Sequence, residues 1–455
     1  MIASRQRAVG PAADVLATLR RHPRHLVLAS LVAGLLVAPL APQLVLLGSL
    51  AAAVLAGRPP LALIATAAVL AGALGGQARL TALDRSQLPP LFGMTVTARA
   101  VVQEQPRPVR YGHTALARIG GEKVMLRIGQ DVRWPAVSTG ALVDVRGRLR
   151  ALGPFEQHYA RRGAHAAVSL DAVAATGRGR GGPMGVVDGI RTRAERALGA
   201  GLPQPQSALL RGMTLGQDEA LDERTRDEFR ISSLAHVLAA SGQNVALLLA
   251  LALPLLAWAG LGLRGRLLGA LALIALYVPL AGAGPSIQRA GAMGAATTVA
   301  ALAGRPASRW YALLLAAAAT LAFNPRASGD PGWQLSFAAV TAIALLAPVT
   351  RRALVARRIP EAVADAIAMS LAATLGTAPL LALHFHQLSL VGIPANLLAA
   401  PAIGPITWLG MLASALGQLS PTLATPLNAV NAYLLAYVGA VAHVAAGVPH
   451  ASVEW

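Results

Sequence analysis

Long apolar stretches, separated by short polar or proline-containing segments, fill both ends of this 455-residue chain. Three of them, at 26–40, 43–56 and 61–77, precede a polar region over residues 84–230. Others follow it at roughly 238–262, 267–283, 290–304, 310–323, 334–349, 364–384, 388–418 and 425–447. Apolar runs of this kind are typical of membrane-spanning helices. The pattern predicts an α-helical polytopic membrane protein with about 10–12 spans, re-entrant segments included.

In the polar region, apolar and polar residues alternate instead of forming long apolar stretches. Alternating segments rich in β-branched residues end at Gly- or Pro-containing turns, at 94–102, 114–119, 123–128, 141–149 and 164–173. They predict a small five-stranded β-barrel, which an OB-like fold would fit. Residues 175–184 are typical of a flexible linker, and 185–199 and 216–232 of amphipathic helices. The predicted domains are 1–80 (three transmembrane helices), 84–174 (barrel), 175–232 (linker and amphipathic helices) and 233–455 (a second transmembrane domain).

Composition supports a membrane protein and excludes several kinds of site. Charged residues make up 13% of the chain, against about 25% in a soluble protein. The net charge is +19 and is carried almost wholly by arginine, because Lys123 is the only lysine. Genome base composition explains the enrichment in arginine as readily as phosphate binding does. The positions of the arginines along the chain therefore have to distinguish the two explanations. The absence of cysteine excludes disulfides, thiolate metal sites and cysteine nucleophiles.

The placement of arginines predicts an orientation through the positive-inside rule. Five arginines before the first span place the N-terminus in the cytoplasm, and three crossings then place residues 84–230 outside. Continuing the alternation puts eight later loop arginines inside and two, Arg289 and Arg326, outside. After Asp365 no charged side chain follows until Glu454, so the rule does not place the C-terminus. The N-terminus is not expected to be a cleavable signal, because further spans follow the first.

One polar cluster leads directly into an apolar run. The sequence AHVLAASGQNVALLLALA at 235–252 contains His236, Ser241, Gly242, Gln243 and Asn244. Polar groups within hydrocarbon need a wet cavity or a protein partner. Ser241 and Gly242 predict a helix break that opens onto a transport path, with Gln243 and Asn244 facing it. The alternative is that these residues join helices through hydrogen bonds.

Four further polar residues are candidates for contact with a transported ligand, namely Arg289, Gln334, Ser336 and Asn396. Arg289 follows a Gly-Pro pair at the outer head of a span, where it would contact a phosphate backbone or serve as an interfacial anchor. Gln334 and Ser336 open the span that follows Asp330, as pore-lining or packing residues. Asn396 lies among three prolines that predict a broken or re-entrant segment, or a kink used only for packing (Pro394, Pro401 and Pro405).

The barrel region is basic, with 12 Lys+Arg against 5 Asp+Glu between residues 91 and 162. Such a surface would hold single-stranded nucleic acid through phosphate contacts, with Tyr111, Trp134 or Phe155 as stacking surfaces. The alternative is a solvated basic surface without a ligand. The sequence alone leaves the two open.

Four ordered motifs in the chain resemble the ComEC family of competence proteins. They are LLRGMTLGQDEALDERTRDEFRISSLAHVLAASGQNVALLL (209–249), GPSIQRAGAM (284–293), DPGWQLSFAAVTAIALLAP (330–348) and TAPLLALHFHQLSLVGIPANLLAAPAIGP (377–405). Members of this family are inner-membrane channels for DNA uptake in natural transformation. The resemblance implies that residues 233–455 form a channel for single-stranded DNA within membrane lipid. It also implies a cytoplasmic helicase-like motor and an external DNA-binding competence protein as partners, and no cofactor.

Two departures from the family pattern limit what the resemblance implies. Many members have Ser-Gly-x-His where this chain has Asn244 at the fourth position, so no histidine role is assigned there. Many also continue into a metallo-β-lactamase-like domain, which is expected to be lacking here, so that a nuclease would be separately encoded. His384 and His386 would point to different faces of a helix, so no metal site is predicted. The chain is not expected to be an enzyme.

Three other functions compete with the channel. A proton- or sodium-coupled transporter usually buries carboxylates, and the predicted spans contain essentially no Asp or Glu. An intramembrane hydrolase would need His236 and Ser241 on one helical face, which their spacing disfavours. A divergent family member with a non-DNA transport or envelope-assembly role stays open.

Overall fold

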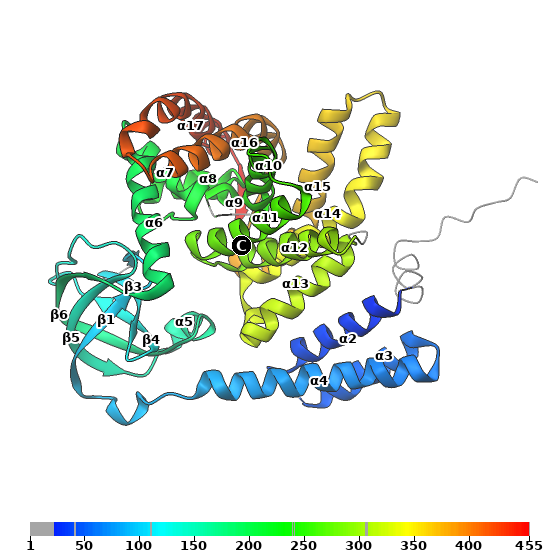
Figure 1. Cartoon of the computed structure of the whole chain (residues 1–455), viewed down its shortest axis with the longest axis horizontal. Coiled ribbons are helices and arrows are strands. Elements are labelled where there is room, and N and C mark those ends of the chain that lie inside the picture. Colours follow the sequence, from blue (N-terminus) through cyan, green and yellow to red (C-terminus); the bar gives the residue numbers. More distant parts are fainter. Residues whose placement is uncertain are drawn as a thin grey trace, which may run out of the picture. The chain divides into compact units, whose positions relative to one another are not determined.

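The structure is a computed structural model that describes residues 22–454, except for 41, 110, 111, 239, 241 and 305–307. The chain forms two compact units, whose elements are labelled in Figure 1. The first contains residues up to Leu83 and Ala292–Ser328, and the second contains Asp84–Gly291 and Gly329–Trp455. Residues 292–328 thus group with the N-terminal helices, across the predicted boundary at 233. The predicted division into four domains stays a prediction.

Apolar helices build the first unit. They are α2 (Pro23–Val37), α3 (Pro42–Ala56), α4 (Pro59–Asp84), the second part of α12 (Pro285–Leu302) and α13 (Arg309–Phe323). Helices α2 and α4 approach closely, because a Cβ at Gly34 would lie 2.1 Å from the backbone oxygen of Val69. A Cβ at Gly72 would likewise lie 2.3 Å from the oxygen of Leu31. Small residues commonly allow such contacts between membrane helices.

The second unit begins with a closed β-barrel. Its strands are β1 (Thr95–Val102), β2 (Arg107–Val109), β3 (Gly112–Ile119), β4 (Glu122–Ile128), β5 (Ala141–Arg150) and β6 (Ala164–Gly179). They pair in the order β1-β5-β6-β4-β3-β2, and a further β1–β3 pairing closes five of them into a barrel. Among the described pairings of the barrel, β4 with β6 is the parallel one. Alternate residues such as Val124, Leu126 and Ile128 fill the interior, so the five predicted strands are confirmed.

The flexible linker predicted at 175–184 is wrong. Strand β6 continues to Gly179, because its backbone still pairs with β5 through Val143↔Ala175 and Ala141↔Gly179. Helix α6 begins only three residues later, at Gly182. The glycines that suggested flexibility serve turn geometry instead, since Gly182 has a φ of 74°. The barrel therefore leads directly into the helical part of its unit.

Helices form the rest of the second unit. The helices before residue 240 are α5 (Gln157–Arg161), α6 (Gly182–Gly199), α7 (Gln204–Leu215), α8 (Glu223–Ile231) and α9 (Ala235–Leu238). The helices after it are α10 (Gly242–Trp258), α11 (Leu263–Leu280), the start of α12, α14 (Pro331–Ala356), α15 (Glu361–Phe385), α16 (Gly392–Leu416) and α17 (Thr425–Ala446). One buried apolar cluster joins α6, α7, α10, α11, α16 and α17. Two short strands, β7 (Gln387–Ser389) and β8 (Ser452–Glu454), pair with each other.

Several helices are apolar and long enough to cross a membrane. Within the described ranges, six meet both criteria and four shorter apolar helices accompany them, against the about 10–12 spans predicted. The chain is therefore a helical membrane protein with a small β-barrel. The broken helix that was one interpretation of the prolines around Asn396 is wrong, because α16 runs unbroken from Gly392 to Leu416 with Pro401 and Pro405 inside it. A proline removes one backbone donor, but neighbouring turns and helices can keep the helix continuous.

Candidate functional site

The N-terminal parts of three helices meet around one arginine in the second unit. Arg289, in the second turn of α12, donates from Nη1 to the backbone oxygen of Ser336 in α14 at 2.8 Å. Its guanidinium carbon lies 5.9 Å from the centre of the Phe337 ring. Gly242 opens α10 against the same guanidinium, since a Cβ there would lie 3.1 Å from Arg289 Nη2. We refer to Gly242, Ser286, Arg289, Ser336 and Phe337 as the Arg289 cluster.

Arg289 is buried without an acidic partner. Only 6% of the residue is exposed, and among the described residues its Nε has no hydrogen-bond acceptor and no carboxylate lies close enough to pair with it. A buried unpaired charge costs several kcal/mol, so a position that keeps one is a candidate functional site. The three helix N-termini add partial positive charge. The cluster is therefore a cationic position suited to an anionic ligand.

Side chains on α14 connect the cluster to its neighbours. The Ser336 hydroxyl donates to Ser286 Oγ of α12 at 3.3 Å. Two residues earlier, Gln334 Oε1 lies 2.7 Å from His384 Nε2 of α15. The structure thus brings together three of the predicted residues, Gly242, Arg289 and Ser336, and places Gln334 on the same helix with a partner on α15. Among the described residues no group of three potential metal ligands occurs.

Asn244 has the partners of a residue that joins helices. Its side chain is 4% exposed, and Nδ2 donates to the backbone oxygen of Met213 at 2.8 Å and to Tyr277 Oη at 3.1 Å. The Tyr277 hydroxyl in turn donates to the backbone oxygen of Thr214 at 2.7 Å. These two oxygens belong to the last turn of α7, where carbonyls lack helical partners. Asn244 and Tyr277 therefore cap α7, and the prediction that Asn244 faces a polar path is not supported by these contacts.

The remaining predicted residues have no described contact with the Arg289 cluster. His236 on α9 is exposed, with Nδ1 3.0 Å from the backbone oxygen of Ser233. Gln243 is exposed on α10, and Asn396 is half-buried on α16. The predicted helix break falls between the end of α9 at Leu238 and the start of α10, while Ser241 lies outside the described residues. Their role in a transport path stays a prediction.

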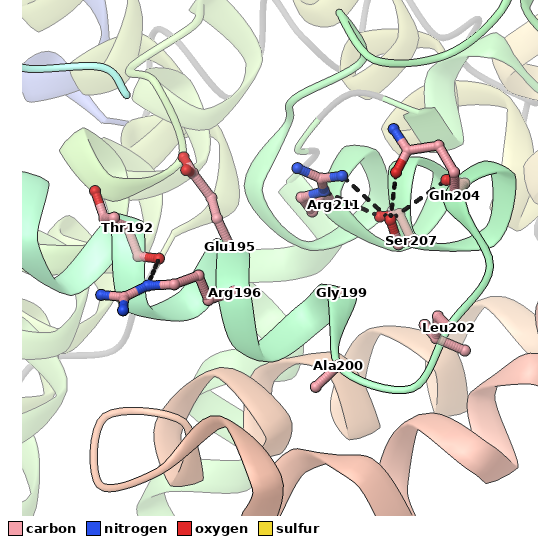
Figure 2. Close-up of a pocket in the computed structure, with 9 residues that line it drawn as sticks. All are labelled: Thr192, Glu195, Arg196, Gly199, Ala200, Leu202, Gln204, Ser207 and Arg211. Carbon is pink, nitrogen blue, oxygen red and sulfur yellow. Dashed lines mark hydrogen bonds between the residues drawn. The ribbon is translucent and has the colours of Figure 1, made fainter. Parts of the chain in front are cut away.

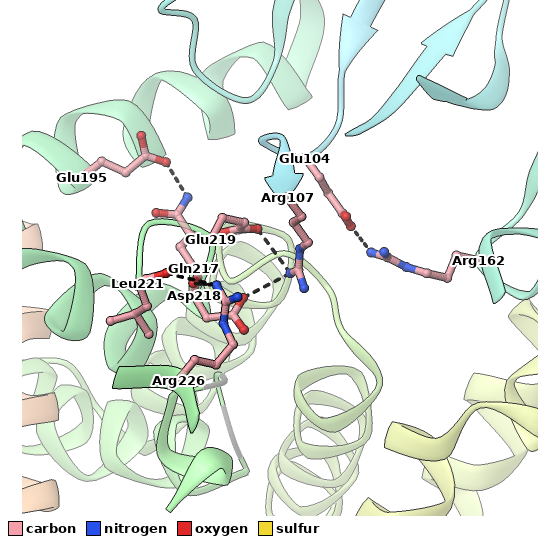
Figure 3. Close-up of polar contacts among 9 residues, drawn as sticks. All are labelled: Glu104, Arg107, Arg162, Glu195, Gln217, Asp218, Glu219, Leu221 and Arg226. Carbon is pink, nitrogen blue, oxygen red and sulfur yellow. Dashed lines mark hydrogen bonds and ion pairs between the residues drawn. The ribbon is translucent and has the colours of Figure 1, made fainter. Parts of the chain in front are cut away.

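Ion pairs attach the barrel to the helical part of its unit (Figure 3). Arg107 of β2 pairs with Asp218 at 3.2 Å and with Glu219 at 3.4 Å, both in the α7–α8 loop. Burial raises the pKa of Glu219, and the charge of Arg107 only partly opposes this. A second contact joins α5 to the residue that precedes Asp330, where Arg161 Nη1 donates to the backbone oxygen of Gly329 at 2.8 Å. These contacts hold the barrel next to α7 and the start of α14.

Helices α6 and α7 form a polar groove of about 400 Å³ (Figure 2). It is lined by Thr192, Glu195, Arg196, Gly199, Ala200, Leu202, Gln204, Ser207 and Arg211. Arg211 turns back onto its own helix, donating from Nη2 to Ser207 Oγ at 3.1 Å. Of the sequence-predicted site residues that the structure describes, none lines this groove.

The three aromatic residues considered on the barrel differ in placement. Phe155 is 95% exposed, whereas Trp134 packs partly against the barrel core. Tyr111 lies outside the described residues. Sequence reasoning missed Ser286 and Phe337 of the Arg289 cluster, and Tyr277 beside Asn244. The two aromatic residues carry no local signal, because an aromatic residue in an apolar span is most often a packing residue.

Comparison with known proteins matches the helical part of the chain. The family model described as "Competence protein" matches residues 213–455. Over 200 residues the chain is 28% identical to "ComE operon protein 3" of Bacillus subtilis (strain 168), covering 44% of this chain and 25% of that protein. Over 236 residues it is 30% identical to "Uncharacterized protein YcaI" of Escherichia coli (strain K12), covering 48% of this chain and 30% of that protein. No solved structure matches significantly.

The chain therefore spans about a quarter to a third of the length of these relatives. The family match begins at Met213, whose backbone oxygen Asn244 binds, and includes every residue of the Arg289 cluster. Because this match extends over more than half of the chain, the protein belongs to the Competence protein family, the ComEC family that its four motifs resemble.

Proposed function

We propose that this protein is a channel that passes a single strand of DNA across the inner membrane into the cytoplasm during natural transformation. The observation that carries the proposal is the buried Arg289, which meets three helix N-termini and has no carboxylate partner among the described residues. Family membership supports DNA uptake as the process.

A strand of DNA carries a phosphate at every nucleotide, so its path needs cations and few carboxylates. Arg289 fits this need, because its Nε is free of acceptors among the described residues while Nη1 is held by Ser336. Arginine binds phosphate through several parallel donors. A passing phosphate would therefore meet a guanidinium that is already held in position and shielded from solvent.

The barrel would receive the strand on the outer side of the membrane. Its closure into five strands with a parallel β4–β6 pair is compatible with an OB-like barrel. The excess of loop arginines on the opposite side supports an extracytoplasmic barrel and a cytoplasmic N-terminus. The link from Arg161 to Gly329 holds the barrel beside the start of α14, which is one wall of the Arg289 cluster.

The energy for passage and the processing of DNA would come from partners. The sequence contains no phosphate-binding loop of the Gly-x-x-x-x-Gly-Lys-Ser/Thr type, so a cytoplasmic helicase-like motor would pull the strand. An external DNA-binding competence protein would deliver it, and a nuclease would remove its complement. We propose that the chain itself is not an enzyme.

The test uses a deletion strain of the source organism, complemented with wild type or with a variant, and given labelled linear DNA that carries a selectable marker. Surface-bound label, nuclease-protected label and transformants are counted separately. Loss of a charge-assisted hydrogen bond costs about 1.5–3 kcal/mol, so Arg289→Ala should lower protected label about 10- to 150-fold at unchanged surface binding. Arg289→Lys keeps the charge, so its amount of nuclease-protected label should lie between those of wild type and Arg289→Ala.

Arg352→Ala is the matched control, because Arg352 is exposed on the same helix as Ser336 and bonds only the backbone oxygen of Pro348 among the described residues. It should take up DNA normally. If Arg289→Ala also does so at equal protein level, the Arg289 cluster is not on the path. If the deletion strain itself takes up DNA normally, the channel proposal fails, and a divergent relative with a non-DNA transport or envelope-assembly role becomes the better explanation.

A further inference from the structure

Phe155 is an apolar ring that the barrel presents to its surroundings. It is 95% exposed, against 56% for Met94, 45% for Val109 and 40% for Leu91, which are other exposed large apolar residues among the described part of the barrel region. It lies in the turn between β5 and α5, and its immediate neighbours Pro154 and Glu156 form the same short helical turn. A fully exposed phenyl ring lacks the stabilisation of about 1.5–3 kcal/mol that burial of its side chain would give.

The turn that carries Phe155 is held rigidly. Arg150 at the end of β5 makes two parallel hydrogen bonds to Glu156, at 2.7 Å and 2.6 Å. Glu156 also accepts from the backbone nitrogen of Gly153 at 2.8 Å. The hydrogen bonds from Arg150 hold the pKa of Glu156 below its usual range, and the charge of Arg127 adds to this. The ring therefore lies on an ordered turn, so a ligand that binds to it loses little affinity to ordering of the protein chain.

Exposed arginines lie on the strands that lead to this turn, and the charge of one of them, Arg127, acts on Glu156. The strand register places Arg127 of β4 beside Ser169 of β6, and Ser169 beside Arg148 of β5. Arg146 lies two residues further along β5, also exposed. The exposed acids on these two strands are Asp171 of β6 and Asp144 of β5, and Asp144 pairs with Arg99 at 3.3 Å. Glu156 is already bonded to Arg150. The surface next to Phe155 thus combines a flat ring with a net positive charge.

The same turn leads to the contact with the helical part. Helix α5 follows Phe155 directly and is fixed to the barrel by Tyr159, whose hydroxyl lies 2.7 Å from Thr114 Oγ1. At its end Arg161 donates to the backbone oxygen of Gly329, next to the N-cap of α14. A ligand that stacks on Phe155 would therefore lie on the element that joins the barrel to the helix that carries Ser336.

We propose that Phe155 is a base-stacking contact for single-stranded nucleic acid, and that its turn directs the strand from the arginines of the barrel towards α14. An aromatic face accepts any base, while the arginines bind the phosphates. A lone ring on a turn of Gly, Pro, Glu and Gln offers too little apolar area for a membrane anchor, whose binding scales with buried area. The direction of the strand rests on the proposed function, but the stacking does not.

The test measures binding of a fluorescein-labelled oligothymidine to the purified full chain in lipid nanodiscs by fluorescence anisotropy. Stacking of one base contributes about 1–3 kcal/mol, so Phe155→Ala should weaken binding about 5- to 150-fold. Phe155→Trp should keep the affinity, and the added indole emission should be quenched when the oligonucleotide binds. Met94→Ala, at another exposed apolar residue, should bind as wild type does. Arg127→Gln should lower the slope of log K against log salt by about 0.7, whereas Phe155→Ala should leave it unchanged.

Wild-type affinity in Phe155→Ala would overturn the stacking role. So would an indole emission in Phe155→Trp that is already blue-shifted and quenched by lipid-borne quenchers without DNA, because the ring would then be a membrane anchor. The two proposals fail separately. If the channel proposal is wrong, Arg289→Ala takes up DNA normally while Phe155→Ala still binds oligonucleotide weakly; if only the stacking is wrong, the reverse holds.

Discussion

Replacement of Asn244 by alanine separates a structural role from a role in the DNA path. The substitution removes the donor that serves the backbone oxygen of Met213 at 2.8 Å and Tyr277 Oη at 3.1 Å. A buried carbonyl left without a partner costs about 1–3 kcal/mol, and the lost packing of a side chain that is 4% exposed adds about 1 kcal/mol. We therefore expect Asn244→Ala to lower the free energy of unfolding by about 2–4 kcal/mol.

Tyr277→Phe removes the hydroxyl that serves the backbone oxygen of Thr214 and should cost about 1–3 kcal/mol. Because both side chains cap one helix end, the double variant should lose less than the sum of the two, with a coupling energy of about 0.5 kcal/mol or more. The assay is thermal unfolding of the detergent-solubilised protein, followed by intrinsic fluorescence, beside DNA uptake normalised to protein level. Gln243→Ala, at the exposed neighbouring position, is the control and should melt as wild type does.

The capping role is refuted if Asn244→Ala keeps the wild-type Tm and shows no coupling to Tyr277→Phe. A loss of uptake under those conditions would return Asn244 to the transport path. A lower Tm with uptake that falls only in proportion to protein level would place it among the residues that hold α7, α10 and α11 together.

Other contacts give three further predictions. Gly242→Ala places a Cβ 3.1 Å from Arg289 Nη2, so nuclease-protected DNA should fall for Ala and further for Val at constant protein level; equal uptake in both would show that the guanidinium position is unimportant. Hydrogen bonds from His443 and Arg224 outweigh the effect of burial and keep the pKa of Glu228 below its usual value. The ionised Glu228 side chain should therefore stabilise the fold above about pH 4.3, and this stabilisation should be lost as pH falls through the lower folded pKa. Glu228→Gln should flatten this part of a Tm-against-pH profile. Arg107→Ala should speed hydrogen exchange in the α7–α8 loop, because it leaves Asp218 and Glu219 without their partner on the barrel, while Arg99→Ala, which breaks a more exposed pair with Asp144, should not.

Periodicity revealed much of the fold because it reports burial directly. The alternation in 94–173 located all five barrel strands, since inward residues such as Val124 and Leu126 must be apolar. It failed at 175–184, where glycines suggested a linker although backbone pairing to β5 continues to Gly179. It failed again at Pro401 and Pro405, because a proline in a span does not show whether neighbouring turns keep the helix continuous.

Three of the five members of the Arg289 cluster were predictable from the sequence, but Ser286, Phe337 and the contacts among the members were not. Arg289, Gly242 and Ser336 were identified because polar residues are costly in apolar segments. Their meeting depends on the packing of α10, α12 and α14, which no local pattern encodes. Asn244 shows the limit most clearly, since its partners are the backbone oxygen of Met213 and a tyrosine on α11. An amide in a span looks the same in sequence whether it faces a path or caps a helix.

The pairing of β7 with β8 constrains how the last helices cross the bilayer. Gln387, Leu388 and Ser389 pair with Glu454, Val453 and Ser452, and a backbone ladder of this kind can form only between segments on the same membrane face. Because α16 and α17 are the helices between them that are long enough to span, the number of crossings there must be even. Both helices cross, or neither does. Hydrogen bonds between β7 and β8 thus determine whether the number of crossings is even or odd in the part of the chain where the positive-inside rule gives no orientation. On the proposed orientation both strands lie outside the cytoplasm.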